Sequence, residues 1–138
     1  SMEPEARPQS ACFACGPQNP HGLGLRFSPL EDQSVGAEWR VAPGFEGFEG
    51  ILHGGIIATM LDEAMAKAVA HRRWQAPTAE LRVRLRKQVA TGETVRIHGW
   101  VVERRKRLIL TEASITGPDG EERAHAWGRF LVLDSETP

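Results

Sequence analysis

The chain has 138 residues, of which 41% are hydrophobic and 25% charged, and this ordinary globular composition excludes wholesale disorder. The net charge is only −1, and no apolar run approaches the roughly 20 residues that span a bilayer, so the composition indicates neither a nucleic-acid partner nor a membrane. Two cysteines are too few for a disulfide scaffold, which is typical of a reducing compartment. We therefore expect a cytoplasmic protein with one domain over residues 12–138, preceded by a flexible segment at residues 1–11.

The charge is unevenly distributed along the chain. Residues 1–70 carry a net charge of −5, and residues 71–138 carry +4. A basic second half is typical of a protein that binds an anionic ligand such as a nucleotide phosphate. The alternative is a solvated face of a sheet.

The first part of the chain predicts a loop and two short strands. Residues 12–24 are rich in Gly, Pro and Asn and predict a loop, and strand-like stretches follow at residues 24–28 and 34–41. Residues 43–50 read PGFEGFEG, which contains too much glycine for regular structure.

Residues 54–72 predict one long helix, because they lack proline and are rich in Ala, Met and Leu. The helix is apolar around most of its circumference, so a sheet must wrap around it. Asp62 is the exception, since its carboxylate lies among small apolar neighbours. Such a group is costly to bury unless it is hydrogen-bonded or functional.

Alternating residues predict four further strands, at 78–89, 93–104, 108–116 and 122–133. Turn residues separate them, so we expect these four strands to form an antiparallel meander in chain order. Two strands, one buried helix and four strands define an α+β fold in which one antiparallel sheet curls around one helix.

His53, Gly54 and Gly55 lie where the glycine-rich loop becomes the helix. Free backbone N–H groups and the positive end of the helix dipole are found at this point, and glycine allows a carbonyl group to approach closely. An oxyanion hole for acyl transfer is built in this way. The alternative is a tight turn in which His53 only caps the helix.

Asp62 follows Gly54 by eight residues, or about 12 Å along a helix. A carboxylate that attacks a carbonyl group, or activates water against it, must lie within about 3.5 Å of the reacting atoms. One helix therefore cannot easily present both residues to the same carbonyl group. Two antiparallel copies can, and we expect a dimer with shared sites.

The segment from Leu52 to Ala64, followed by Thr78 to Leu81, resembles the hotdog-fold acyl-CoA thioesterase superfamily, and the phenylacetyl-CoA thioesterase-like branch in particular. The resemblance extends from Cys12 to Leu133. It implies an antiparallel sheet wrapped around one long central helix, a homodimer or homotetramer, hydrolysis of an acyl-CoA substrate to a free acid and coenzyme A, and no cofactor.

The resemblance also implies a role for each residue of the motif. Gly54 matches the backbone donor to the thioester oxygen, and Gly55 supports the turn. Asp62 of the other subunit matches the general base or nucleophile, and Thr78 matches the residue that holds the attacking water or the carboxylate. His53 matches the motif histidine, which shapes the loop or contacts the substrate.

One position departs from the family pattern. Some relatives carry Asn or Gln six residues before the histidine, where this chain has Gly47. Asp62 and Thr78 must therefore do more of the work of placing water.

Further residues are candidates for binding the substrate. Phe48, with Phe45, precedes the histidine and is expected either to line an acyl pocket or to pin the loop to the core. Arg86, Lys87 and Arg107 fall at strand ends, where they match a clamp for the phosphates of coenzyme A or, alternatively, serve solubility.

Cys12 and Cys15, with His21, offer at most three metal ligands, whereas a closed zinc site needs four. We therefore expect no metal site, and a turn with free thiols; metal binding between subunits and redox pairing are the alternatives.

Three other functions remain open from the sequence. An enoyl-CoA hydratase would need a paired Asp and His that are not found around Asp62. A non-catalytic acyl-CoA-binding or sensing module would use the same pocket. A nucleic-acid role would rest on Arg82, Arg84 and Arg86, and it predicts salt-sensitive binding.

Overall fold

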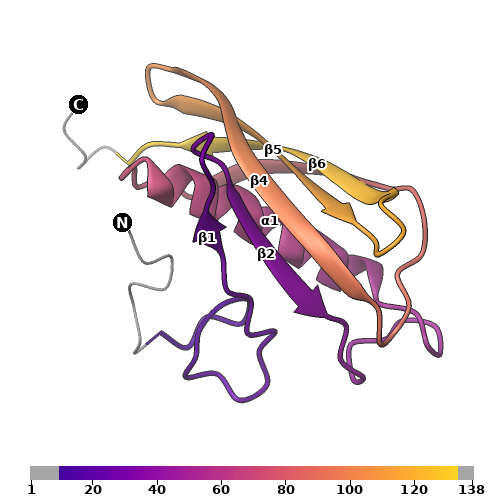
Figure 1. The fold of residues 1–138 in the computed structure, drawn as a ribbon. Coiled ribbons are helices and arrows are strands. Elements are labelled where there is room, and N and C mark those ends of the chain that lie inside the picture. The colour runs from indigo at the N-terminus through magenta and orange to yellow at the C-terminus, as the bar shows by residue number, and fades with distance from the viewer. Residues whose placement is uncertain (1–9, 134–138) are drawn as a thin grey trace.

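The computed structural model describes residues 10–133, so most of the expected flexible segment, residues 1–9, and the last residues of the expected domain, 134–138, lie outside the described residues. The elements follow the expected order of two strands, one helix and four strands (Figure 1). They are β1 (Ser28–Pro29), β2 (Val35–Arg40), α1 (Gly54–His71), β3 (Thr78–Leu85), β4 (Thr94–Arg105), β5 (Leu108–Thr116) and β6 (Glu122–Leu131).

The strands form one antiparallel sheet in the order β1-β2-β4-β5-β6-β3, and α1 lies across one face of it (Figure 1). The α+β class and the sheet around one helix are confirmed. The expected four-stranded meander is wrong, because only β4, β5 and β6 follow one another. β3 pairs with β6, and β2 takes the place beside β4.

The segment between β3 and β4 explains this difference. Thr91 and Gly92 have the composition of a hairpin turn, but the Gly92 N–H donates to the Val41 carbonyl at the end of β2. Gly92 adopts φ 92°, a left-handed conformation that glycine accepts readily. After this turn the chain continues as β4, which pairs with β2 and not with β3.

Two strands differ most from their expected bounds. β1 covers only Ser28–Pro29, so Ser28 is the one residue of the stretch at 24–28 that lies in a strand. β3 ends at Leu85 instead of continuing to residue 89, because the next two amides, of Arg86 and Lys87, both donate to the Arg123 carbonyl. That shared acceptor interrupts the regular ladder.

Helix α1 begins where His53 caps it. The His53 Nδ1 accepts a hydrogen bond from the Gly55 N–H at 2.8 Å, which satisfies one of the free donors of the first turn. The helix ends at His71, and Arg73 then adopts φ 65°, which stops the helical path. Among the described residues, no helix is long and apolar enough to cross a membrane.

Two strand glycines allow α1 to lie very close to the sheet. A Cβ atom on Gly99 of β4 would lie 2.4 Å from the Ala64 carbonyl oxygen, and one on Gly128 of β6 would lie 2.8 Å from the Met65 sulfur. At Gly99 the helix atom is backbone, so no larger residue fits there without movement of the helix, whereas at Gly128 it is the flexible end of the Met65 side chain. The middle of α1, which carries Asp62, therefore packs backbone to backbone on β4.

The core lies between α1 and the sheet and includes the segment that leads into β1. Its largest fully buried side chains come from every layer of the molecule: Leu25, Phe27, Met60, Leu61, Met65, Ile97, Ile109, Ile115 and Phe130.

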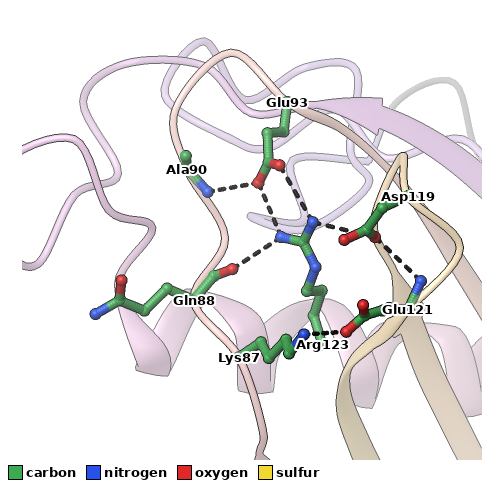
Figure 2. Close-up of polar contacts among 7 residues, drawn as sticks. All are labelled: Lys87, Gln88, Ala90, Glu93, Asp119, Glu121 and Arg123. Carbon is green, nitrogen blue, oxygen red and sulfur yellow. Dashed lines mark hydrogen bonds and ion pairs between the residues drawn. The ribbon is translucent and has the colours of Figure 1, made fainter.

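A buried arginine joins the segment between β3 and β4 to the turn between β5 and β6. The Arg123 guanidinium lies between Glu93 and Asp119 and also donates to the Gln88 carbonyl (Figure 2). Its side chain is 8% exposed. The hydrogen bond from Arg123, with one from the Ala90 N–H, lowers the pKa of Glu93. The network thus shapes residues 86–93, to which Leu52 is bonded just before the helix.

Replacing Arg123 with Met should lower the free energy of unfolding by about 3 kcal/mol, because it leaves the Glu93 carboxylate partly buried without its partner. A lowered carboxylate pKa contributes stability that is present above its ordinary value and is lost as the pH falls through the lowered one. The deficit measured by urea unfolding should therefore shrink below about pH 4. An equal deficit at pH 7 and pH 3 would contradict this ion-pair assignment.

Candidate active site

The first turn of α1 presents one unused backbone donor. The Gly55 N–H is bonded to His53, but the Gly54 N–H donates to no acceptor within residues 10–133. A Cβ atom on Gly54 would lie 3.0 Å from the Leu85 side chain, so this turn lies against the end of β3. The structure therefore gives His53 and Gly55 a capping role and leaves Gly54 as the donor at the positive end of the helix dipole.

Asp62 and Thr78 are in direct contact. The Thr78 hydroxyl, at the first residue of β3, donates to the Asp62 Oδ1 at 2.7 Å. The apolar neighbours of Asp62 in the sequence suggested a fully buried carboxylate. In one chain Asp62 is instead half-buried, and its carboxylate is hydrogen-bonded to Thr78. Thr78 is exposed, which leaves the pair accessible.

The two halves of this site lie at opposite ends of one strand. Gly54 lies beside Leu85, the last residue of β3, whereas Asp62 is bonded to Thr78, the first. The strand between them spans about 23 Å at the usual rise per residue. One chain therefore does not bring the Gly54 donor and the Asp62 carboxylate to a common point.

β3 is an edge strand with an exposed surface. It pairs with β6 on one side, and seven of its eight residues are exposed. Leu81 and Leu85 remain 39% and 55% exposed. A long edge strand with uncovered apolar side chains is unusual in a monomer, since it offers unpaired backbone groups to another strand.

The two phenylalanines of the 43–50 loop have different surroundings. Phe45 packs against Phe13 and Trp39, with ring centroids 6.4 and 5.9 Å away, so it pins the loop to the core. Phe48 is 81% exposed at the other end of the same loop. Only Phe48 is available to a ligand or to another chain.

The three candidate phosphate-binding residues are not brought together. Arg86 and Lys87 follow Leu85, at the end of β3 that lies beside Gly54, and they form ion pairs with Glu122 and Glu121. Arg107 lies at the opposite end of the sheet, where it donates to the Val132 carbonyl.

The alternating arginines of β3 face away from the helix. The Arg82 guanidinium lies 4.3 Å from the centroid of the Trp127 ring, and Arg84 lies 5.8 Å from it. Cation–π contacts of this kind hold both groups on the outer face of the sheet.

A second cluster lies on the other flank of α1. The sulfurs of Cys12 and Cys15 and a carboxylate oxygen of Glu63 all lie within 4.8 Å of one another, and His21 is not part of this group. Glu63 could not be recognised from the sequence as part of this cluster, because 48 residues separate it from Cys15 and its i,i+4 spacing to Lys67 indicates only a helix-surface ion pair.

The arrangement of one long helix against a six-stranded antiparallel sheet is the hotdog fold, and similar structures bear this out. A thioesterase superfamily protein, 26% identical, matches 87% of this chain with a TM-score of 0.83, and this chain spans 62% of that protein. The protein smu.793 from Streptococcus mutans UA159, solved bound to acetyl CoA, is 21% identical, with 79% and 88% of the two chains covered and a TM-score of 0.74. The E. coli PaaI protein from the phenylacetic acid degradation operon is 16% identical, with 80% of each chain covered and a TM-score of 0.75.

The family model of the thioesterase superfamily matches residues 49–124, from the loop before His53 to β6. No curated protein sequence matches the chain. The match covers more than half of the chain, which therefore belongs to the thioesterase superfamily, as the motif from Leu52 to Ala64 indicated.

Proposed function

We propose that this protein hydrolyses acyl-CoA thioesters at a site shared by two antiparallel copies of the chain. The observation that carries the proposal is the placement of an unused N–H donor, Gly54, and a hydroxyl-bonded carboxylate, Asp62, at opposite ends of an exposed edge strand. Membership of the thioesterase superfamily and the acetyl CoA bound to a structure of the same fold support the substrate class.

Self-pairing of β3 would complete the site. Antiparallel pairing about the middle of the strand sets Thr78 of one copy opposite Leu85 of the other. Asp62 is bonded to Thr78, and Gly54 lies beside Leu85, so each carboxylate then faces the helix start of the partner. The same pairing covers Leu81 and Leu85 and satisfies the edge of the sheet.

The reaction follows from these two groups. The thioester oxygen accepts a hydrogen bond from the Gly54 N–H, which stabilises the negative charge that develops on it. In the first route, Asp62 of the partner copy takes a proton from water as the water oxygen bonds to the carbonyl carbon; the carbon–sulfur bond then breaks, and coenzyme A leaves as a thiol with the proton that Asp62 had accepted. In the second route, the Asp62 carboxylate bonds to the carbonyl carbon and the carbon–sulfur bond breaks, so that coenzyme A leaves as a thiolate that takes a proton from solvent. Water then hydrolyses the anhydride to the free acid and restores the Asp62 carboxylate. The Thr78 hydroxyl keeps Asp62 oriented in either route.

Coenzyme A would lie at the Gly54 end of β3. Arg86 and Lys87 are exposed there, and their ion pairs with Glu122 and Glu121 are solvent-accessible enough to exchange for phosphate. Arg107 belongs to the other end of the sheet, so it would have to come from the partner copy. Phe48, exposed in the loop before His53, would contact the acyl group.

The test is the release of free thiol from aryl-, short-, medium- and long-chain acyl-CoAs, with enoyl-CoA hydration measured in parallel. We expect thiol release from at least one acyl class and no hydration. Hydration without thiol release would identify a hydratase. Tight acyl-CoA binding without turnover, in a folded dimer, would identify a binding module and overturn the proposal.

A further inference from the structure

We propose that Cys12, Cys15 and Glu63 bind one Zn²⁺ ion, with a fourth position left for water, and that this ion joins the N-terminal loop to the flank of α1. Nothing in the proposed hydrolysis uses these residues. The three donor atoms come from two segments of chain and lie within 4.8 Å of one another. Two sulfur ligands of one tetrahedral zinc ion lie roughly 3.8 Å apart, so side-chain rotation alone brings the donors into place.

The turn that carries the two cysteines is fixed by its backbone. The Gly16 N–H donates to the Cys12 carbonyl at 2.8 Å. A Cβ atom on Gly16 would lie 2.2 Å from the Cys12 nitrogen, so the turn has this close form only with glycine at that position. The amides of Leu23 and Leu25 bond to the carbonyls of Phe13 and Ala14, which ties the turn to the segment that enters the core.

The chemistry of the cluster favours a cation. Cys15 is buried, and its sulfur lies within 4.8 Å of the Cys12 sulfur and of a Glu63 carboxylate oxygen. The Glu63 side chain is only 15% exposed, so its carboxylate is held beside two thiols in a largely buried position. Zn²⁺ prefers thiolate and carboxylate ligands and displaces their protons on binding.

Lys67 balances the remaining charge. Two thiolates and one carboxylate around Zn²⁺ leave one negative charge, and the Lys67 ammonium lies 3.7 Å from the Glu63 carboxylate. The outer ion pair also orients the ligating carboxylate, as supporting residues do around other zinc sites. Charge and ligand type thus agree with a zinc site that has three protein ligands.

The site would stabilise the fold, because the chain between Cys15 and Glu63 closes a large loop that the ion pins at both ends. Zinc at 100 times its dissociation constant should raise the Tm of the full chain by roughly 5–10 °C. The rise should be absent in the Cys12→Ala variant. Cys12 is exposed, so this variant should fold even where Cys15→Ala does not.

The experiment is a titration of the reduced, metal-free full chain with Co²⁺ and then with Zn²⁺. We expect one Co²⁺ per chain, with sulfur-to-cobalt charge-transfer absorption and tetrahedral visible bands, displaced by Zn²⁺. Cys12→Ala should weaken binding by more than the roughly 100-fold that the loss of a supporting residue costs, and Glu63→Gln should shift the visible bands. Glu49→Gln, an exposed glutamate outside the cluster, is the matched control and should bind as wild type does.

Three outcomes would overturn the proposal. The first is no retained metal in the reduced wild-type chain. The second is binding that survives Cys12→Ala. The third is a chain that responds only to oxidant, with a mass lower by two hydrogens, because a Cys12–Cys15 disulfide would then be the function of the pair.

Discussion

The Asp62→Asn variant should lose thioester hydrolysis by about 10²–10⁴-fold in kcat, the usual contribution of a general base. Asparagine has nearly the same shape, and its oxygen can accept the Thr78 hydrogen bond that Asp62 accepts at 2.7 Å. The fold and the proposed dimer should therefore persist while the proton acceptor is lost. The measurement is kcat for the best acyl-CoA of the panel, with circular dichroism and light scattering on the same samples.

The matched control for Asp62→Asn is Glu38→Gln. Glu38 is an exposed residue of β2 that pairs with Arg96 at the surface, far from α1 in the chain. The Glu38→Gln substitution makes the same change from carboxylate to amide and should leave kcat within about twofold of wild type. An Asp62→Asn protein that turned over at a similar rate would show that Asp62 neither activates water nor attacks.

The second large effect is expected from Gly54→Pro. Proline has no N–H group, so this change removes the proposed donor to the thioester oxygen and should cost about 10²–10³-fold in kcat. The helix should tolerate it, because Gly54 is the first helical residue and His53 already has φ −63° and ψ 135°, the conformation that a residue before proline prefers. Gly54→Ala keeps the N–H group and requires only a shift of the Leu85 side chain, so its kcat should fall far less.

The two inactive variants together test whether the site is shared. A purified heterodimer of Asp62→Asn and Gly54→Pro chains has one site with both changes and one with neither, if Gly54 and Asp62 of different chains meet. It should recover about half of the wild-type activity. If both residues served one carbonyl group within a single chain, each site would carry one lesion, and the heterodimer would stay inactive.

Local features of the fold could be predicted closely. α1 begins at Gly54 as expected, because the features that determine a helix start all lie in adjacent residues: a glycine-rich loop, the capping residue and an unbroken apolar run. The turns around Lys106 and Gly120 are where the sequence placed them, and both residues have a positive φ. The order of strands could not be predicted in the same way. β3 pairs with β6 because residues 86–93 lead the chain across to β2, and no local pattern encodes that path.

In the candidate site, too, contacts between neighbouring elements could be predicted, whereas contacts that depend on the strand order could not. The contact of Thr78 with Asp62 was one expected possibility, since the threonine opens the strand after the helix. The position of Arg123 was not expected, because its partners Glu93 and Asp119 belong to two separate turns that meet only through the strand order. Glu63 was likewise missed as a partner of Cys12 and Cys15, because the N-terminal loop reaches it only after folding.

The close packing of α1 on Gly99 has a consequence for substrate choice in the proposed reaction. A helix in van der Waals contact with a strand moves only by losing that packing, so acyl groups of different length are not expected to be admitted by movement of the backbone that carries Asp62. We therefore expect selectivity to depend on parts that can change independently, namely the 43–50 loop with its exposed Phe48 and the surface that a second chain would supply in the proposed dimer. Exchanging residues of that loop should alter which acyl-CoA is preferred and leave the position of the carboxylate unchanged.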